Sequence, residues 1–403
     1  REEEQKQQEE EAARQREEAE KKRLKDEEEA KRQQEQQQQQ QQATAAAAAV
    51  PPQPSSEAAV AQPSAAEPPA PAAAEAAVAA SSGPISQGVS CQEDYERLRA
   101  DFGPKDAQVV GIAKAKGEAK MALLQIKKEV SPHVAAIVPA VPVCKRVINE
   151  LCQVLAKHQA DPLNGFYSML ALATRFVPSK QTGDVGDKLI YGYAAVGVHV
   201  GLAFPEFLRI WRYLMHKACP LTAPVCPSGP SADQALGREK DEDADAWNTR
   251  VGLCMRQFAV FLQTDINAAL IPDMVAGRFA GRLPAHPFGL DRAWVWTATV
   301  LNFPPEVLQA RRDVWTTALA YMLDRAGHAL LGRYRWQCGK LLAVIQGQYL
   351  PLVSAQAAGG DTDNVSLKVG VQMLQDFFEA YHKGGVRPCE ARTLDAAGSG
   401  QVG

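Results

Sequence analysis

The sequence lacks the cysteine pattern of a metal site or a disulfide framework. Its eight cysteines are scattered along 403 residues, and none forms a CxxC pair. Cys219 and Cys226 lie close in sequence, but no second pair of Cys or His ligands accompanies them, so zinc binding is not predicted. A reduced intracellular protein is the simplest interpretation of this cysteine usage.

Motifs for catalysis are also missing. The sequence contains no HExxH, no Gly-x-Ser-x-Gly, and no P-loop, since Tyr334 and Leu341 stand where "CGKLL" would need Gly and Ser/Thr. The most apolar window, "LIYGYAAVGVHVGLAF" from Leu189, is too short to cross a bilayer and contains His199. We therefore expect a buried helix there and a binding or scaffolding protein rather than an enzyme.

The charges nearly balance. Lys and Arg total 44, Asp and Glu total 47, and the formal net charge is −3. This balance argues against a surface that binds nucleic acid all over, but it allows a local basic pocket.

The composition divides the chain into four segments. Residues 1–42 are built from Glu, Gln, Lys, Arg and Ala, which predicts a charged helix resembling the end of a coiled-coil region, although no apolar seam is present. Residues 43–90 are rich in Ala, Pro and Ser and are predicted to be a disordered linker. Residues 91–386 should form the folded domain, and residues 387–403 a disordered tail.

Helical periodicity dominates residues 91–386 and predicts an all-α fold. Pro205 and Pro305 suit first turns of helices, and Asp161 and Asp291 suit N-caps. About ten helices with short turns favour an α-solenoid of stacked antiparallel helix pairs, and an irregular bundle is the alternative. The polar segment Cys226–Ala246 is predicted to be an exposed loop. Its carboxylates should form a solvated acidic patch: Glu239, Asp241, Glu242 and Asp243.

Basic side chains form three groups. The first holds Lys114, Lys116, Lys120, Lys127 and Lys128; the second holds Arg175 and Lys180; the third holds Arg209, Arg212, His216 and Lys217. Such cations commonly cover helix surfaces, and those near a helix C-terminus interact favourably with its dipole. In a solenoid, however, the three groups could converge on a pocket for a polyphosphate.

Three stretches resemble one known family. They are "KACPLTAPVCP", "AHPFGLDRAWVWTATVLNFPP" and "GRYRWQCGKLLAVIQGQYLPLV". They are similar to the C-terminal domain of the GLE-one mRNA export factor family, and the resemblance covers about Cys91 to Tyr381. It implies a HEAT-repeat-like or MIF4G-like stack of helix pairs.

The resemblance also implies a function without covalent chemistry. Family members bind and activate a DEAD-box RNA helicase at the cytoplasmic face of the nuclear pore and promote RNA release during mRNA export. Inositol hexakisphosphate can bridge the two proteins. Implied further partners are nucleoporins, including a small Phe-Gly nucleoporin, and translation initiation and termination factors. Insertion into a membrane is not implied, and the N-terminal helix is a candidate for self-association.

The family's polyphosphate pocket carries over unevenly. Lys127, with Lys128, stands before Ser131-Pro132, Arg175 occupies the neighbourhood of the second contribution, and Lys217 matches the first lysine of a Lys-Lys-Cys-Pro run. Ala218 and Leu214 replace residues that are basic in the family. Arg212 and His216, on the same predicted helix, are candidates to compensate.

Two rival functions share this helical class. A translation scaffold without a role at the pore would bind initiation factors and leave helicase ATPase unchanged. Direct RNA binding through Lys114–Lys128 would weaken steeply with salt.

Overall fold

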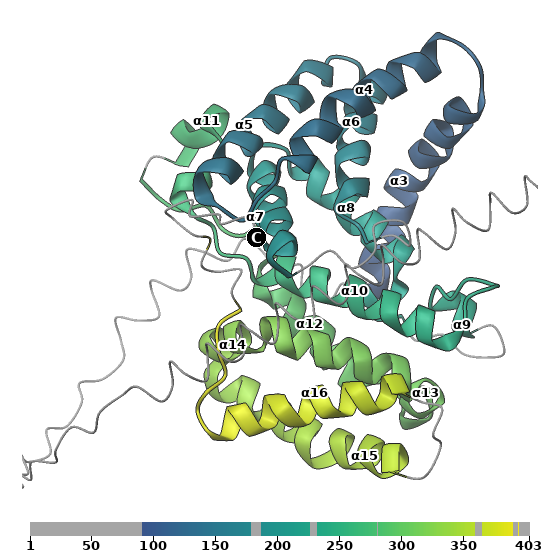
Figure 1. Ribbon diagram of the computed structural model, residues 1–403, viewed down its shortest axis with the longest axis vertical. Coiled ribbons are helices and arrows are strands. Elements are labelled where there is room, and N and C mark those ends of the chain that lie inside the picture. The colour runs from purple at the N-terminus through teal and green to yellow at the C-terminus, as the bar shows by residue number, and fades with distance from the viewer. Residues whose placement is uncertain are drawn as a thin grey trace, which may run out of the picture. The chain divides into compact units, whose positions relative to one another are not determined.

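The computed structural model describes residues 91–178, 187–225, 232–279, 281–358, 365–389 and 394. The predicted charged helix over 1–42 and the linker over 43–90 lie outside these residues, as does most of the predicted tail. Within the described ranges the elements are helices and no β-strand occurs, which confirms the all-α prediction (Figure 1). None of the described helices is long and apolar enough to cross a membrane.

The longer helices all lie within residues 91–386, where helical periodicity predicted them. They are α3 (Cys91–Lys114), α4 (Glu118–Ala135), α5 (Val141–His158), α6 (Pro162–Arg175), α7 (Asp187–Ala203), α8 (Pro205–Ala218), α10 (Ala244–Gln263), α12 (Gly289–Leu301), α14 (Arg312–Val344), α15 (Leu350–Ala358) and α16 (Val365–His382). Shorter helices are α9 (Ala232–Ala235), α11 (Asp273–Ala276) and α13 (Pro305–Ala310), and a π-helical turn spans Ile345–Tyr349.

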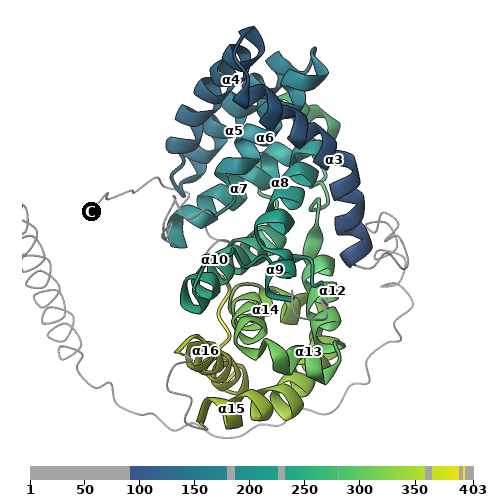
Figure 2. The ribbon, with the colours of Figure 1, turned by 90° about the vertical axis from the view of Figure 1, so that its right-hand side faces the viewer.

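The first part of the described chain is a stack of helix pairs. α4 packs against α6 and α6 against α8, while α5 packs against α7 and α7 against α10 (Figure 2). Alternate helices therefore lie side by side in two layers, and this regular alternation confirms the predicted stack. Farther along the chain, α14 packs against α10, α12 and α16, and α15 covers α16.

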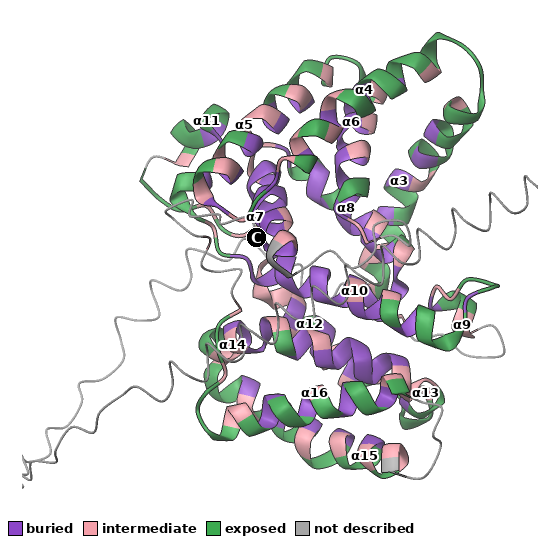
Figure 3. Cartoon of the chain, viewed as in Figure 1, coloured by how far each residue is buried: buried purple, intermediate pink, exposed green. Residues whose placement is uncertain are grey.

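The expected buried helix is α7. Figure 3 shows buried positions concentrated on α7, α10 and α14, at the centre of the packed helices. His199 on α7 is fully buried, donates from Nδ1 to the Ala195 carbonyl and accepts from the Asn267 N–H at Nε2. Burial lowers its pKa to about 4, so the imidazole is neutral at pH 7.

Aromatic side chains join the two layers. The Trp211 ring on α8 stacks on Phe261 of α10 with centroids 4.0 Å apart, and its indole N–H donates to the Phe176 carbonyl. Gly201 on α7 leaves room for the Leu208 side chain of α8, because a Cβ there would lie only 2.0 Å from a methyl carbon of Leu208. α8 is thus fixed between α6, α7 and α10.

Several predicted helix starts are confirmed, and one is wrong. Asp161 caps α6 by accepting from the Asn164 N–H at 2.7 Å, and Pro205 and Pro305 begin α8 and α13. Asp291 is not an N-cap, because α12 already begins at Gly289 with Phe288 before it. The Asp291 carboxylate instead accepts from Tyr334 and Arg333 on α14.

The predicted loop Cys226–Ala246 is also partly wrong. It contains α9 and the start of α10, whose N-cap is Asp243. Glu242 is not part of a solvated patch, since its side chain is 1% exposed and forms an ion pair with Arg250 at 2.7 Å. Arg250 also donates to the carbonyls of Ala218 and Gly237, so this buried pair ties α10 to the end of α8.

Candidate functional site

The cationic side chains of α8 face α3, and the two helices pack against each other. The amphipathic sequence of α8 buries Phe207, Ile210, Trp211 and Met215, which orients the opposite side of the helix toward α3. Pro220 follows the helix, and Cys219 is extended at the C-cap, as expected for a residue before proline.

Carboxylates of α3 contact the α8 cations one by one. Asp94 accepts from Arg212 at 2.7 Å, and Asp106 accepts from Lys217 at 2.6 Å. Asp101 pairs with Arg209 in the same way. We call this set of pairs the α3–α8 contact. It means that the basic stripe of α8 is already matched by acidic side chains of the same chain.

The Asp94 carboxylate forms ion pairs with two arginines. Besides Arg212, it accepts from Arg292 of α12 at 2.6 Å. The Arg212 side chain is only 7% exposed, and burial lowers its pKa to about 10, with the neighbouring Arg292 charge acting in the same direction. The guanidinium therefore remains charged at neutral pH and depends on Asp94 for compensation.

His216 lies in the interior below these arginines. The Thr222 hydroxyl donates to the Cys219 carbonyl, so the His216 Nδ1–H must be the donor in its 2.7 Å bond to the same hydroxyl. Burial lowers the pKa of His216 well below its usual value, and the charge of Arg212 lowers it further. His216 is thus a neutral interior residue.

Lys217 is the most accessible of the three predicted residues on α8. Its side chain is 55% exposed, whereas its partner Asp106 is only 11% exposed and also accepts from the Tyr213 hydroxyl at 3.0 Å. The lysine can therefore reach solvent while its ammonium group stays beside a fixed carboxylate.

The remaining predicted residues are exposed on the two preceding helices of the same layer. Lys127 and Lys128 are exposed on α4, and Arg175 is exposed in the last turn of α6. Among the described residues, no hydrogen bond or ion pair joins their side chains to the α8 group. The structure thus places the candidates on three neighbouring helices of one layer, α4, α6 and α8, but brings only Arg212 and His216 into a common cluster.

The carboxylates of α3 were missed from the sequence. The segment "CQEDYERLRADFGPKD" does carry a signal, because Asp94 and Asp101 are seven residues apart and so lie on one face of a helix. A search for an acidic helix face to match the basic stripe of α8 could have found them.

The match to known proteins agrees with this fold. Residues 105–346, more than half of the chain, match the family described as GLE1-like protein. The chain belongs to this family.

Curated relatives of this GLE1-like chain are named mRNA export factor GLE1. The mouse protein is 27% identical over 177 residues, covering 41% of this chain and 23% of the mouse protein. The Arabidopsis thaliana protein is 27% identical over 194 residues, covering 48% of this chain and 26% of that protein. Each match thus spans less than a third of the relative's length.

Solved structures show the same fold. A chain in a structure of a Saccharomyces cerevisiae Dbp5 variant C-terminal domain bound to Gle1 and IP6 aligns with a TM-score of 0.59 and 18% identity, covering 74% of this chain and 99% of that chain. A second such structure, with a Gle1 variant, aligns with a TM-score of 0.57 and 19% identity, covering 73% and 98%.

Proposed function

We propose that this GLE1-like chain is the helicase-binding part of a non-enzymatic mRNA export factor. It binds a DEAD-box RNA helicase, activates its ATPase cycle and promotes RNA release at the cytoplasmic face of the nuclear pore. The observation that supports this most is the family match together with the shared fold of a chain from a structure containing Dbp5, Gle1 and IP6. Binding to nucleoporins and to translation factors remains a prediction from the resemblance.

The proposed mechanism is a shift in the helicase's conformational equilibrium. A scaffold activates an ATPase without chemistry of its own if it binds the open, RNA-free form more tightly than the RNA-clamped form. The stacked helices suit this role, because a well-packed stack presents surface residues from several helices in fixed positions.

Inositol hexakisphosphate is proposed as a bridge between the two proteins. Exposed or half-exposed cations lie on three neighbouring helices of one layer: Lys127, Lys128, Arg175 and Lys217. Their ammonium and guanidinium groups can form charge-assisted hydrogen bonds with phosphate. Arg212 and His216, predicted as compensating contacts, lie in the interior with partners of their own. The proposed bridge therefore relies on the other four residues.

Charge reversal tests this function directly. The variant carrying Lys127→Glu, Lys128→Glu and Lys217→Glu should lose about tenfold or more in helicase ATPase stimulation with inositol hexakisphosphate, because each change replaces attraction by repulsion. The matched control is Lys368→Glu, an exposed lysine on α16. Stimulation that is equal in both variants would contradict the bridge, and absence of helicase binding by the unmodified chain would contradict the function.

A further inference from the structure

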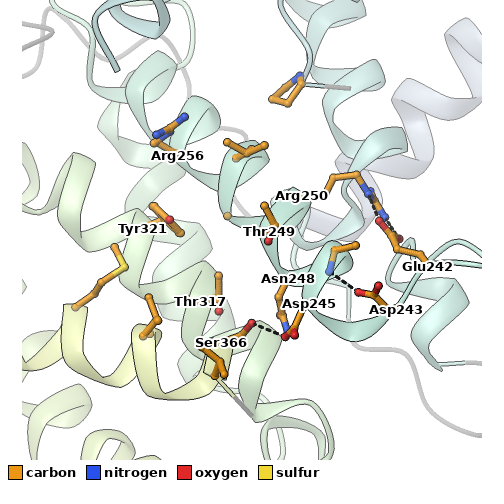
Figure 4. Close-up of a pocket in the computed structure, with 18 of the residues that line it drawn as sticks. Glu242, Asp243, Asp245, Asn248, Thr249, Arg250, Arg256, Thr317, Tyr321 and Ser366 are labelled. Carbon is orange, nitrogen blue, oxygen red and sulfur yellow. Dashed lines mark hydrogen bonds and ion pairs between the residues drawn. The ribbon is translucent and has the colours of Figure 1, made fainter. Parts of the chain in front are cut away.

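A groove lies between α10, α14 and α16. These three helices pack against one another and enclose a volume of about 810 Å³ (Figure 4). Carboxylates line one end and apolar side chains line the wall formed by α16. We call it the α10–α14–α16 groove.

The acidic end carries charge that the described residues do not neutralise. Asp243 accepts from the Ala246 N–H as the N-cap of α10, and Asp245 accepts from the Ser366 hydroxyl at 3.3 Å. Neither these two aspartates nor the exposed Asp241 has an ion pair with a cation in the part of the chain that the structure describes. Two arginines also line the groove: Arg250 is held by Glu242, and Arg256 lies at the end away from Asp243 and Asp245 (Figure 4).

A buried amide points to the kind of ligand. Asn248 is 3% exposed and lines the groove near Asp245 and Thr317 (Figure 4). Its Nδ2 donates to the Asp313 carboxylate at 3.2 Å, which fixes the amide orientation because a carboxylate can only accept. Its Oδ1 is buried and, among the described residues, has no donor. A ligand that supplies N–H groups would satisfy it.

The apolar wall formed by α16 would have no role in binding a simple ion. Val365 and Val369 are 57% and 51% exposed, and Met373 continues the same side of α16. No group of three or more His, Cys, Asp or Glu side chains among the described residues is placed to hold a metal ion. Acidic and apolar surfaces side by side fit a chain segment that carries both cationic and aliphatic side chains.

We propose that the α10–α14–α16 groove binds a basic, partly aliphatic peptide segment of a protein partner. Its Lys or Arg side chains lie against Asp241 and Asp245, an N–H group reaches the Asn248 carbonyl oxygen, and aliphatic side chains cover Val369 and Met373. A nucleic acid does not fit this site, because its phosphates would meet carboxylates.

A labelled peptide tests the site on the full chain. The probe is a fluorescent peptide of alternating Lys/Arg pairs and Leu, compared with one in which Glu replaces each Lys and Arg, and binding is followed by fluorescence anisotropy. The double variant Asp241→Lys with Asp245→Lys should weaken binding of the basic peptide at least about tenfold, since each change reverses a charge beside the peptide. The acidic peptide should not bind the unmodified chain.

Two further variants distinguish peptide binding in the groove from non-specific electrostatic attraction to the chain. Asp376→Lys reverses an exposed charge on α16 outside the groove and should leave peptide affinity within about twofold. Val369→Ser should weaken binding about threefold while leaving net charge unchanged. Equal losses with Asp376→Lys and the double variant, no loss with Val369→Ser, or no binding of the basic peptide would each overturn the proposal. Helicase stimulation provides a separate readout, which the double variant should not change.

Discussion

The α3–α8 contact and the α10–α14–α16 groove use charge in opposite ways. In the contact, Arg209, Arg212 and Lys217 are each matched by an aspartate of the same chain. In the groove, Asp241 and Asp245 are exposed and form no ion pair with a cation among the described residues. A charged side chain that pairs with an opposite charge of the same chain holds two elements together. A charged side chain without such a pair can bind an opposite charge of a ligand. The number of charges in a sequence segment does not distinguish the two cases.

Removing the Asp94 carboxylate should disrupt the α3–α8 contact and produce the largest loss of stability. Asp94→Ala leaves the buried Arg212 guanidinium without a carboxylate and removes the partner of Arg292, so we expect the free energy of unfolding to fall by about 3 kcal/mol. Chemical denaturation measured by circular dichroism checks this value.

Asp101→Ala is the matched control for that experiment. Its pair with Arg209 is about half exposed on both sides, so the same deletion should cost less than about 1 kcal/mol. Equal losses in the two variants would show that the contact is not anchored at Asp94.

The second largest effect should come from lowering the pH, which acts on the α3–α8 region and not on the groove. His216 lies below the α3–α8 contact, whereas no histidine lines the groove. The folded pKa of His216 is far below the unfolded value, so only the unfolded chain gains a proton as the pH falls below about 6.5. Stability is therefore full above that pH and falls by about 1.4 kcal/mol per pH unit below it for each such histidine.

His216→Gln should remove one histidine's share of this slope. The measurement is the free energy of unfolding between pH 7.5 and 5, compared with the variant His382→Gln, which changes an exposed residue of α16. A slope that His216→Gln leaves unchanged would contradict a neutral buried His216. His199 and His286, each with a pKa lowered to about 4 by burial, should account for much of the remaining slope.

The smallest expected effect is a change in ligand affinity at Lys217, whose charge is paired with Asp106. If the proposed polyphosphate bridge is correct, Asp106→Asn removes a competing carboxylate, keeps a hydrogen-bond acceptor for Tyr213, and should raise affinity for inositol hexakisphosphate about threefold. Calorimetry with the helicase present measures this change.

Asp376→Asn is the control for net charge. It removes the same charge from α16, outside both regions, and should leave the affinity nearly unchanged, because only the carboxylate that pairs with Lys217 competes with the phosphate. A similar gain from both variants would mean that net charge, rather than the partner of Lys217, sets the affinity.

Helix boundaries were largely predictable from local signals. Proline starts, the Asp161 cap and apolar periods act within a few residues, so they are readable without a structure. The error at Glu242 arose because polar composition does not reveal that a carboxylate has a buried arginine partner.

The candidate site was less predictable because it depends on pairing across the chain. The basic stripe of α8 is evident in the sequence, but its matching aspartates come from a helix more than a hundred residues earlier. Periodicity cannot tell which helix will cover which face. The availability of a cation is therefore a tertiary property, even where its position on a helix is local.

The double pairing of Asp94 has a consequence for how the chain is made. Its two partners lie on α8 and α12, and Arg292 is separated from it by 198 positions in sequence. During synthesis, α3 leaves the ribosome long before Arg292 exists, so the first described helix can be fully seated only after α12 has emerged. This closure between distant segments should form late in folding, and a ribosome stalled before α12 should leave the start of α3 open to protease.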